Sequence, residues 1–249
     1  MDRQTYDQIY SLLKSPSDFK NLSEQFSVPS EVLSILLGQK IVRDTTRRYY
    51  KVKKMAPQFL RRWSRGETLL KLAQEIEYSP YMTASLILQD NGAGRKGVLS
   101  LFRNPDSAPP RLREELRDVL AKEYVYSPKN TQVQVERGRN VESKVGRWLD
   151  ARGVQYITEE EARRLHKKTP DFLLKSPITV DGAIANWVEC KATFGDDFEV
   201  KRDYGKQLKY YVEMFGPGCA VYWYELLDDI RYDQITLKTG SYFREHAQS

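Results

Sequence analysis

The chain has few of the residues that build disulfide frameworks or zinc sites. Its 249 residues include only two cysteines and two histidines. Cys190 and Cys219 each lie inside an apolar run, which is typical of buried free thiols and of a reducing compartment. His166 and His246 are far apart and lack the spacing of metal ligands, so a zinc site is not expected.

Long apolar runs and a secretory signal are also missing. No stretch approaches the roughly 18 to 20 apolar residues that a membrane helix needs. The N-terminal stretch MDRQTYDQIYSLLKS lacks the basic and apolar regions of a signal peptide. The glycine-containing stretch at residues 91–97, NGAGRKG, lacks the terminal Lys-Ser/Thr of a P-loop. We therefore expect a soluble intracellular protein without P-loop chemistry, with a nuclear address only if its source is eukaryotic.

Positive charge is concentrated in one part of the chain. The formal net charge is +6, but residues 40–65 contain ten lysines or arginines and one acid, a local charge of +9. At helical spacing these cations form a ridge on one side of a predicted helix from Lys40 to Lys54. Such a ridge is typical of a polyanion site, and a solvated helix face is the alternative. The candidate nucleic-acid contacts here are Lys40, Arg43, Arg47, Arg48, Lys51, Lys54, Arg61 and Arg62.

Two segments around this ridge share a helix-turn-helix pattern. Residues 19–39 and 69–89 align at an offset of fifty, and each reads as helix, short turn, helix. Pro29 or Pro80 lies early in the second helix of each unit, where its missing N–H costs little. The pattern predicts DNA contact by at least one unit. Packing or partner binding is the alternative, because the turn lacks the glycine often found there.

The sequence pattern changes near residues 126–132, YSPKNTQ, which have the composition of a domain boundary. We predict an all-α region at 1–130 and a mixed α/β domain at 131–249. The predicted elements of the second domain are a helix at 140–153, strands at 154–158, 171–180 and 183–193, a helix at 203–216, and a strand at 219–226, with a further edge strand at 230–238. Asp181-Gly182 suits a tight hairpin turn between two of these strands. The predicted order is αβββαβ.

One predicted strand carries two charged residues in an apolar run. Period two places Glu189 and Lys191 on one face and Cys190 on the other. The preceding strand begins with Asp171, and a hairpin can bring that carboxylate beside Glu189. Two close carboxylates are tolerated when a divalent cation lies between them, and Mg²⁺ favours carboxylates with water and phosphate oxygens. This set is what metal-assisted phosphodiester hydrolysis requires, and a buried structural ion network is the alternative.

These residues resemble a known nuclease superfamily. The pair PD, followed eighteen residues after Asp171 by ECK, resembles the PD-(D/E)XK superfamily, which shares the restriction-endonuclease-like fold. The stretches TPDFLLKSPITVDGAIANWVECKATFGD, FGPGCAVYWYE and LLKLAQEIEYSPYMTASLIL are similar to the codanin-interacting nuclease family, a TPD-motif family related to archaeal Holliday-junction resolvases. The resemblance implies a restriction-endonuclease-like mixed sheet behind an all-α region with helix-turn-helix-like units.

The resemblance also implies a metal site. Asp171 and Glu189 would bind Mg²⁺ or Mn²⁺, helped by the backbone carbonyl of Cys190. Lys191 would activate water or offset charge on the phosphorane. The helix-borne Glu142 would hold the ion through water or bind a second one, unless it is a surface acid of its helix.

Four further positions follow from neighbouring motifs. Gln207 and Tyr211 match the Q-x-x-x-Y pattern of several branches of the superfamily and would orient Lys191 or the scissile phosphate. Their alternatives are a polar cap over the hairpin for Gln207 and a core aromatic for Tyr211. Lys167 and Lys168 precede Asp171 closely and are candidate contacts to flanking phosphates, with a solvated loop as the alternative.

We therefore expect a Mg²⁺-dependent endonuclease that acts on duplex or branched DNA. Two other functions stay open. One is a catalytically vestigial scaffold that binds a codanin-like protein partner. The other is a helix-turn-helix regulator, which would leave the trio of Asp171, Glu189 and Lys191 unexplained. The motifs do not distinguish DNA from RNA, a monomer from a homodimer, or one cleavage polarity from another.

Overall fold

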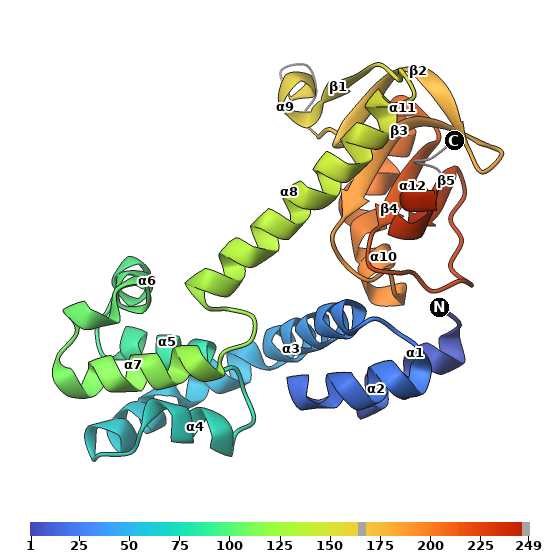
Figure 1. Ribbon diagram of the computed structural model, residues 1–249. Coiled ribbons are helices and arrows are strands. Elements are labelled where there is room, and N and C mark those ends of the chain that lie inside the picture. Colours follow the sequence, from blue (N-terminus) through green and yellow to red (C-terminus); the bar gives the residue numbers. More distant parts are fainter. Residues whose placement is uncertain (164–167, 246–249) are drawn as a thin grey trace. The chain divides into compact units, whose positions relative to one another are not determined.

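The computed structural model describes residues 1–163 and 168–245. These residues form two compact units: Met1–Leu37 together with Glu136–Ser249, called here the α/β unit, and Gly38–Val135, called the helical unit (Figure 1). We predicted a division near residue 130, but we did not predict that Met1–Leu37 would belong to the same unit as the C-terminal half of the chain.

Polar contacts explain why the N-terminal helix belongs to the α/β unit. The helix α1 (Arg3–Leu12) places the Tyr6 hydroxyl 2.6 Å from Asp196, to which it donates a hydrogen bond. The Tyr6 ring also stacks on Phe194, with the ring centroids 5.4 Å apart. Arg3 forms ion pairs with Asp197 and Asp229. These partners are more than 180 residues away in sequence, so the local pattern of α1 does not reveal them.

A five-stranded mixed sheet forms the centre of the α/β unit. The strands lie in the order β1 (Tyr156–Thr158), β2 (Phe172–Val180), β3 (Ala183–Lys191), β4 (Gly218–Tyr222) and β5 (Ile235–Thr239). The first three strands pair antiparallel, whereas β3, β4 and β5 pair parallel. A mixed α/β architecture with the predicted order of elements is therefore confirmed, including the extra edge strand.

The β2–β3 hairpin fixes the register of the sheet. Asp181 and Gly182 have φ values of 51° and 78°, the left-handed geometry that a two-residue hairpin turn requires. The register shifts between Leu173 and Ile178, and beyond this irregularity Phe172 lies opposite Val188. The start of β2 is thus brought beside the end of β3, where the predicted trio lies.

In sequence, helices precede, separate and follow the strands of the sheet. The 23-residue helix α8 (Pro128–Asp150) precedes β1, and α9 (Glu159–Ala162) follows it. Between β3 and β4 the chain forms α10 (Asp197–Asp203), the π-helix η3 (Tyr204–Leu208) and α11 (Lys209–Phe215). The C-terminal helix is α12 (Gly240–Glu245). The predicted boundary segment 126–132 contains the start of α8 at Pro128, and the two units divide between Val135 and Glu136.

The helical unit is built around one long helix. The helix α3 (Ser30–Ser64) has 35 residues, contains the predicted basic helix and belongs to this unit from Gly38 onward. The short helix α2 (Phe19–Phe26), which precedes α3, belongs to the α/β unit. The other helices of this unit are α4 (Leu69–Glu75), α5 (Pro80–Asp90), α6 (Arg95–Arg103) and α7 (Pro110–Lys122), with the 3₁₀ turn η2 (Pro105–Ser107). The 3₁₀ turn η1 (Pro16–Asp18) belongs to the α/β unit. Their core includes Phe59, Leu72, Ile87 and Leu116.

Both predicted helix-turn-helix segments contain a helix, a tight turn and a second helix. In the second segment Ser79 caps α5 by accepting a hydrogen bond from the backbone of Met82, and Pro80 is its first residue. In the first segment Ser27 is left-handed, but the following helix α3 runs far beyond the predicted end at residue 39. A separate finding concerns all the helices. Within the described part of the chain, no helix combines the length and apolar character that a membrane span requires.

Candidate active site

The carboxylates of Asp171 and Glu189 meet at one end of the β2–β3 pair. The Asp171 N–H donates to Glu189 Oε2 at 3.2 Å, and the Cys190 N–H donates to Asp171 Oδ2 at 2.7 Å. These contacts follow from the antiparallel register, because Phe172 opposite Val188 places the preceding Asp171 beside Glu189. The expected approach of the two acids is therefore present.

Lys191 completes the trio on the same face of β3. Its Nζ lies 2.6 Å from Glu189 Oε1 and 2.6 Å from Gln207 Oε1, so it donates to both. The side chains of Lys191 and Glu189 are 16% and 5% exposed, respectively. A buried charge needs such partners, and here each charged group has one of opposite sign or a polar acceptor.

The electrostatics of the trio favour an additional cation. Burial raises the pKa of Asp171 well above its ordinary value, and the Glu189 carboxylate raises it further. Burial also raises the pKa of Glu189, although Lys191 opposes this change. Burial alone would lower the pKa of Lys191, but Glu189, Asp203 and Asp171 outweigh it and raise that pKa overall. Among the described residues, the Lys191 ammonium group pairs with Glu189 and its charge also acts on Asp171.

Glu142 lies on α8 and lines an acidic hollow together with Asp171. The hollow has a volume of about 500 Å³, and its other acidic side chains are Asp150, Glu159 and Glu160. The Glu142 charge contributes to the raised pKa of Asp171. Among residues 1–163 and 168–245, no three His, Cys, Asp or Glu side chains are grouped as a metal-binding cluster. A cation at Asp171 and Glu189 would therefore need backbone carbonyl, water or phosphate oxygens as further ligands.

By the alternation of side chains along β3, the Cys190 side chain lies on the opposite face of the strand from Glu189 and Lys191. Burial raises the pKa of its thiol well above the ordinary value. Its backbone, not its side chain, lies at the site, because the N–H already donates to Asp171. This agrees with the use of the backbone carbonyl that the family resemblance implies, which stays a prediction.

Gln207 and Tyr211 reach the site from the segment after β3. The π-helix η3 contains Gln207, whose side-chain oxygen accepts from Lys191. The Tyr211 side chain is buried, its hydroxyl donates to the Thr169 carbonyl at 2.7 Å, and its ring packs edge-on against Trp187. Tyr211 is therefore a core aromatic that also holds the residues leading to Asp171. Burial raises its pKa further, so the hydroxyl keeps its proton.

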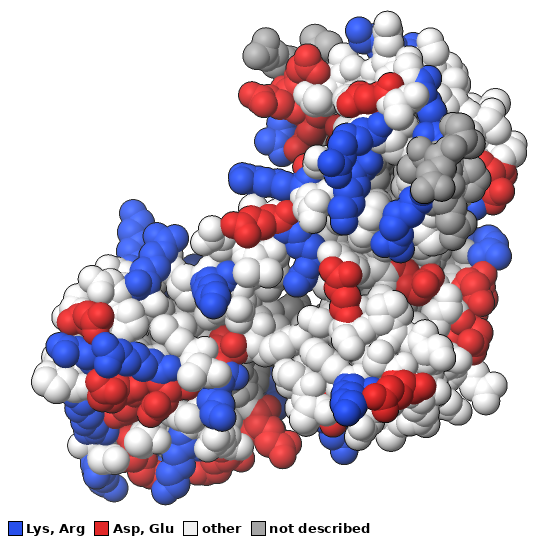
Figure 2. All heavy atoms as spheres, in the orientation of Figure 1, with Lys and Arg blue, Asp and Glu red and all other residues white. Residues whose placement is uncertain are grey.

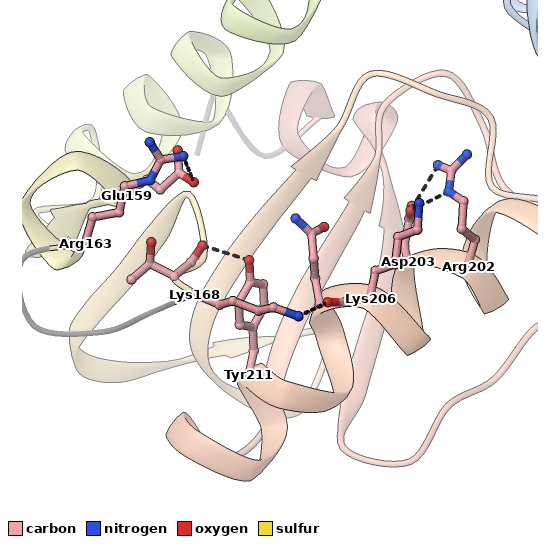
Figure 3. Close-up of a pocket in the computed structure, with 9 residues that line it drawn as sticks. Glu159, Arg163, Lys168, Arg202, Asp203, Lys206 and Tyr211 are labelled. Atoms are coloured by element: carbon pink, nitrogen blue, oxygen red, sulfur yellow. Dashed lines mark hydrogen bonds and ion pairs between the residues drawn. The ribbon is translucent and has the colours of Figure 1, made fainter.

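A basic hollow of about 570 Å³ lies beside Gln207 and Tyr211 (Figure 3). Its cations are Arg163, Lys168, Arg202 and Lys206. Arg163 and Arg202 form ion pairs with Glu159 and Asp203, and the Lys168 Nζ donates to the Lys206 carbonyl at 2.6 Å. Lys206 is exposed. Sequence reasoning named Lys168 but missed Arg202 and Lys206, whose proximity to Gln207 on one helical segment was the available signal. The predicted Lys167 lies outside the described residues.

Two cations of the predicted basic ridge have internal partners. Arg48 pairs with Asp44 at 2.8 Å and donates to the backbone carbonyls of Ile76 and Glu77. Arg62 forms ion pairs with Glu67 and Glu75. These arginines connect α3 to the segment that contains α4, which gives them a structural role.

The remaining ridge residues differ in exposure. Lys51, Lys54 and Arg61 are exposed along α3, and Arg47 is exposed although it pairs with Asp44. Lys40 and Arg43 are only partly exposed. The exposed subset of the ridge is therefore Arg47, Lys51, Lys54 and Arg61.

Comparisons with known proteins place the chain in a family. Residues 108–242 match the family described as "Protein of unknown function TPD sequence-motif", a span that contains Thr169, Pro170 and Asp171. CDAN1-interacting nuclease 1 of Xenopus laevis is 28% identical over 266 residues, covering 96% of this chain and 88% of that protein. Proteins of the same name from Bos taurus and Homo sapiens are 30% and 29% identical over 171 residues, covering 65% of this chain and 61% of each relative. No solved structure matches. The chain belongs to the TPD sequence-motif family.

Proposed function

We propose that this protein is a metal-dependent endonuclease that hydrolyses phosphodiester bonds in duplex or branched DNA. The observation on which the proposal depends is the meeting of Asp171, Glu189 and Lys191 at one end of the β2–β3 hairpin. The relatives are named nucleases, which supports the same reaction class for this chain. The three antiparallel strands, the helical segment and the parallel β4 also support a restriction-endonuclease-like core.

The residues at the site fit a Mg²⁺ or Mn²⁺ ion. Asp171 and Glu189 are close acids with raised pKa values, Glu189 buried and Asp171 partly buried, so a divalent cation would relieve their repulsion. Among the described residues, Lys191 is the base that forms an ion pair with Glu189. Mg²⁺ in proteins commonly takes one or two carboxylates and completes its shell with water and phosphate oxygens. The holding groups would be these two acids and the Cys190 carbonyl, with Glu142 acting through water. When bound, such an ion supplies Lewis-acid stabilisation of the phosphate and a water of lowered pKa.

Lys191 and Gln207 would orient the reacting groups. The raised pKa of Lys191 keeps its Nζ protonated at neutral pH, and two acceptors hold it in place. A fixed ammonium group can hold the attacking water and offset negative charge that develops on the phosphorane. Gln207 acts through Lys191, and Tyr211 acts through the backbone before Asp171, so both are positioning residues.

Two basic surfaces would bind the polyanion. The first is the hollow with Lys168 and Lys206, which lies beside Gln207 and suits phosphates that flank the scissile bond. The second is the exposed subset of the ridge on α3, in the helical unit. Exposed cations bind the nucleic-acid backbone without reading its sequence, so we infer recognition of shape more than of base order.

A scaffold that binds a codanin-like protein is the second candidate. The name of the relatives, CDAN1-interacting nuclease 1, favours this function alongside catalysis. Under the scaffold alternative, the trio would be a structural ion network and the protein would not cut nucleic acid. The helix-turn-helix segments would support a third function, a DNA-binding regulator, which predicts preference for one duplex sequence.

A cleavage assay separates these functions. Wild-type protein, Asp171→Asn and the control Asp233→Asn, an exposed acid of the same unit, are compared in Mg²⁺, in Mn²⁺ and in EDTA. The substrates are labelled single-stranded, duplex, flap and four-way-junction DNA, and RNA. We expect metal-dependent cutting by wild type and control, and a loss of at least about 100-fold in Asp171→Asn, the scale of removing one electrostatic contact to a transition state. Equal cutting by both variants would reject the site, and no cutting by any protein would leave the scaffold function.

A further inference from the structure

A second pocket in the α/β unit is lined by cations and aromatic rings. It has a volume of about 460 Å³ and lies between α8, α12 and the segment after β4. Its cations are Lys144, Arg147, Arg152 and Arg244. Figure 2 shows Lys and Arg side chains grouped over the C-terminal part of α8 and over α12. None of the described residues that line this pocket is acidic.

Aromatic rings hold three of these cations in place. Lys144 Nζ and Arg244 Cζ lie 5.0 and 5.4 Å from the centroid of the Trp223 ring, and Arg152 Cζ lies 4.0 Å from that of Trp148. Both tryptophans are buried, at 5% and 7% exposure, so each ring offers little surface to a ligand, whereas Arg147 and Arg244 are exposed. Like charges held together repel one another, and an anion between them relieves that repulsion.

An independent observation also indicates a missing acceptor. The Trp148 Nε1 is buried and donates to no acceptor among the described residues. A buried N–H without an acceptor is unfavourable, and in folded proteins such a donor usually finds an acceptor on the protein, on water or on a ligand. The Trp148 side chain lines the pocket but its Nε1 is buried, so the surrounding cations are the groups that a ligand with oxygen acceptors would meet.

We propose that this pocket binds a phosphate group of a nucleic-acid strand outside the scissile bond. Three of the four cations are arginines, whose planar fork matches phosphate oxygens. Because the indole rings are buried, base stacking is not the mode of contact, and the pocket holds the backbone. Arg147 lines both this pocket and the acidic hollow that contains Glu142 and Asp171, so a strand in the proposed active site passes close to it. The inference rests on the proposed nuclease function for the identity of its ligand.

The test is DNA binding without cleavage. Fluorescence anisotropy in EDTA compares wild type with Lys144→Gln/Arg244→Gln and with the matched control Lys175→Gln/Lys201→Gln, two exposed lysines of the same unit. We expect the pocket variant to bind a labelled duplex or junction about tenfold more weakly. The slope of log K against log salt should fall by about 1 for each phosphate contact that is lost. Equal affinity and equal slope in the pocket and control variants would overturn the inference.

Two further measurements distinguish a loss of phosphate contact from a loss of structure, and an internal phosphate from a terminal one. Arg147→Gln removes a charge that no described aromatic ring holds, so a weaker affinity at unchanged melting temperature supports the inference without disturbing Trp223. Oligonucleotides with and without a 5′-phosphate distinguish an internal phosphodiester from a terminal phosphate: equal binding supports the first, and binding only of the phosphorylated strand overturns the backbone assignment. Inability of the wild type to cut DNA in metal, with the pocket effect intact, would reject the proposed function alone. Normal cutting by the wild type, together with equal DNA affinity in the pocket and control variants, would reject this inference alone.

Discussion

The Nζ of Lys191 and the Oε1 of Gln207 are 2.6 Å apart although sixteen residues separate them in sequence. This bond joins the end of β3 to the π-helix η3, so the position of the ammonium group depends on both elements. A π-turn inside a helical segment widens the helix locally and is often found at functional sites. Here it contains the residue that holds Lys191.

Replacement of Lys191 tests the charge balance of the trio. Lys191→Met leaves the buried Glu189 carboxylate without its cation, so we expect a loss of about 3 kcal/mol in the free energy of unfolding, the scale of a broken buried ion pair. Cleavage should fall by at least about 100-fold. Urea denaturation and the cleavage assay measure the two effects. The control Lys209→Met, on an exposed lysine of α11, should change neither, and a fully active Lys191→Met would contradict the assigned role.

Gln207 is expected to affect turnover more than binding. Gln207→Ala removes one of the two acceptors of the Lys191 ammonium, so kcat should fall by about tenfold while KM stays near the wild-type value, the pattern of a contact that matters in the transition state. Gln207→Glu restores an oxygen acceptor and should recover part of kcat. A change confined to KM in both variants would indicate that Gln207 binds substrate and does not position Lys191.

Tyr211 tests the structural support of Asp171. Tyr211→Phe removes the hydrogen bond to the buried Thr169 carbonyl and should lower the free energy of unfolding by about 1 to 2 kcal/mol. Tyr211→Ala also removes a buried ring and should cost about 3 to 5 kcal/mol. Denaturation curves check both, with Tyr50→Phe as the control because that ring is 75% exposed. If Tyr211→Phe abolished cleavage at full stability, the hydroxyl would have a direct catalytic role.

The ion pair of Arg62 and Glu67 gives the helical unit an acid-sensitive contact. The hydrogen bonds from Arg62 lower the pKa of Glu67 from 4.5 to about 2. Because the folded-state pKa lies below the unfolded value, the stabilisation is complete above about pH 4.5 and is lost as pH falls toward 2. The Glu67→Gln variant should therefore have a lower melting temperature than wild type at pH 6, and the two melting temperatures should converge near pH 2. Calorimetry across this range measures the difference, and the exposed control Asp118→Asn should show no such convergence.

The ridge on α3 should divide into binding and structural residues. Lys51→Gln/Lys54→Gln removes two exposed cations, so DNA affinity and its salt dependence should fall while the melting temperature stays unchanged. Arg48→Gln breaks an ion pair and hydrogen bonds to two backbone carbonyls, so it should lower the melting temperature. Anisotropy and calorimetry on the same variants distinguish the two effects. The opposite assignment, with Arg48 essential for DNA binding at full stability, would contradict this division.

Local patterns predicted the hairpin and the shared face of its charges. Alternation along β3 placed Glu189 and Lys191 together, and the Asp181-Gly182 pair predicted the turn that brings Asp171 to them. These features depend on backbone geometry over a few residues, which a sequence specifies directly.

Contacts between distant segments were not predictable in the same way. The partners of Arg48 and Arg62 are side chains and carbonyls on another segment, and the pattern of α3 alone made both arginines look like exposed cations. The π-turn at η3 has no propensity signal of its own. The helix α8 begins inside the predicted boundary segment, because Pro128 lies at a position where proline begins a helix as readily as it ends one.

The packing of Tyr6 against Phe194 and Asp196 has a consequence for how the chain acquires its structure during synthesis. The helix α1 leaves the ribosome well before its docking surface, which is translated more than 180 residues later. The intervening segment Gly38–Val135 has its own core and is available to fold meanwhile. Nascent chains halted before residue 194 should therefore contain a protease-resistant middle and a protease-sensitive beginning.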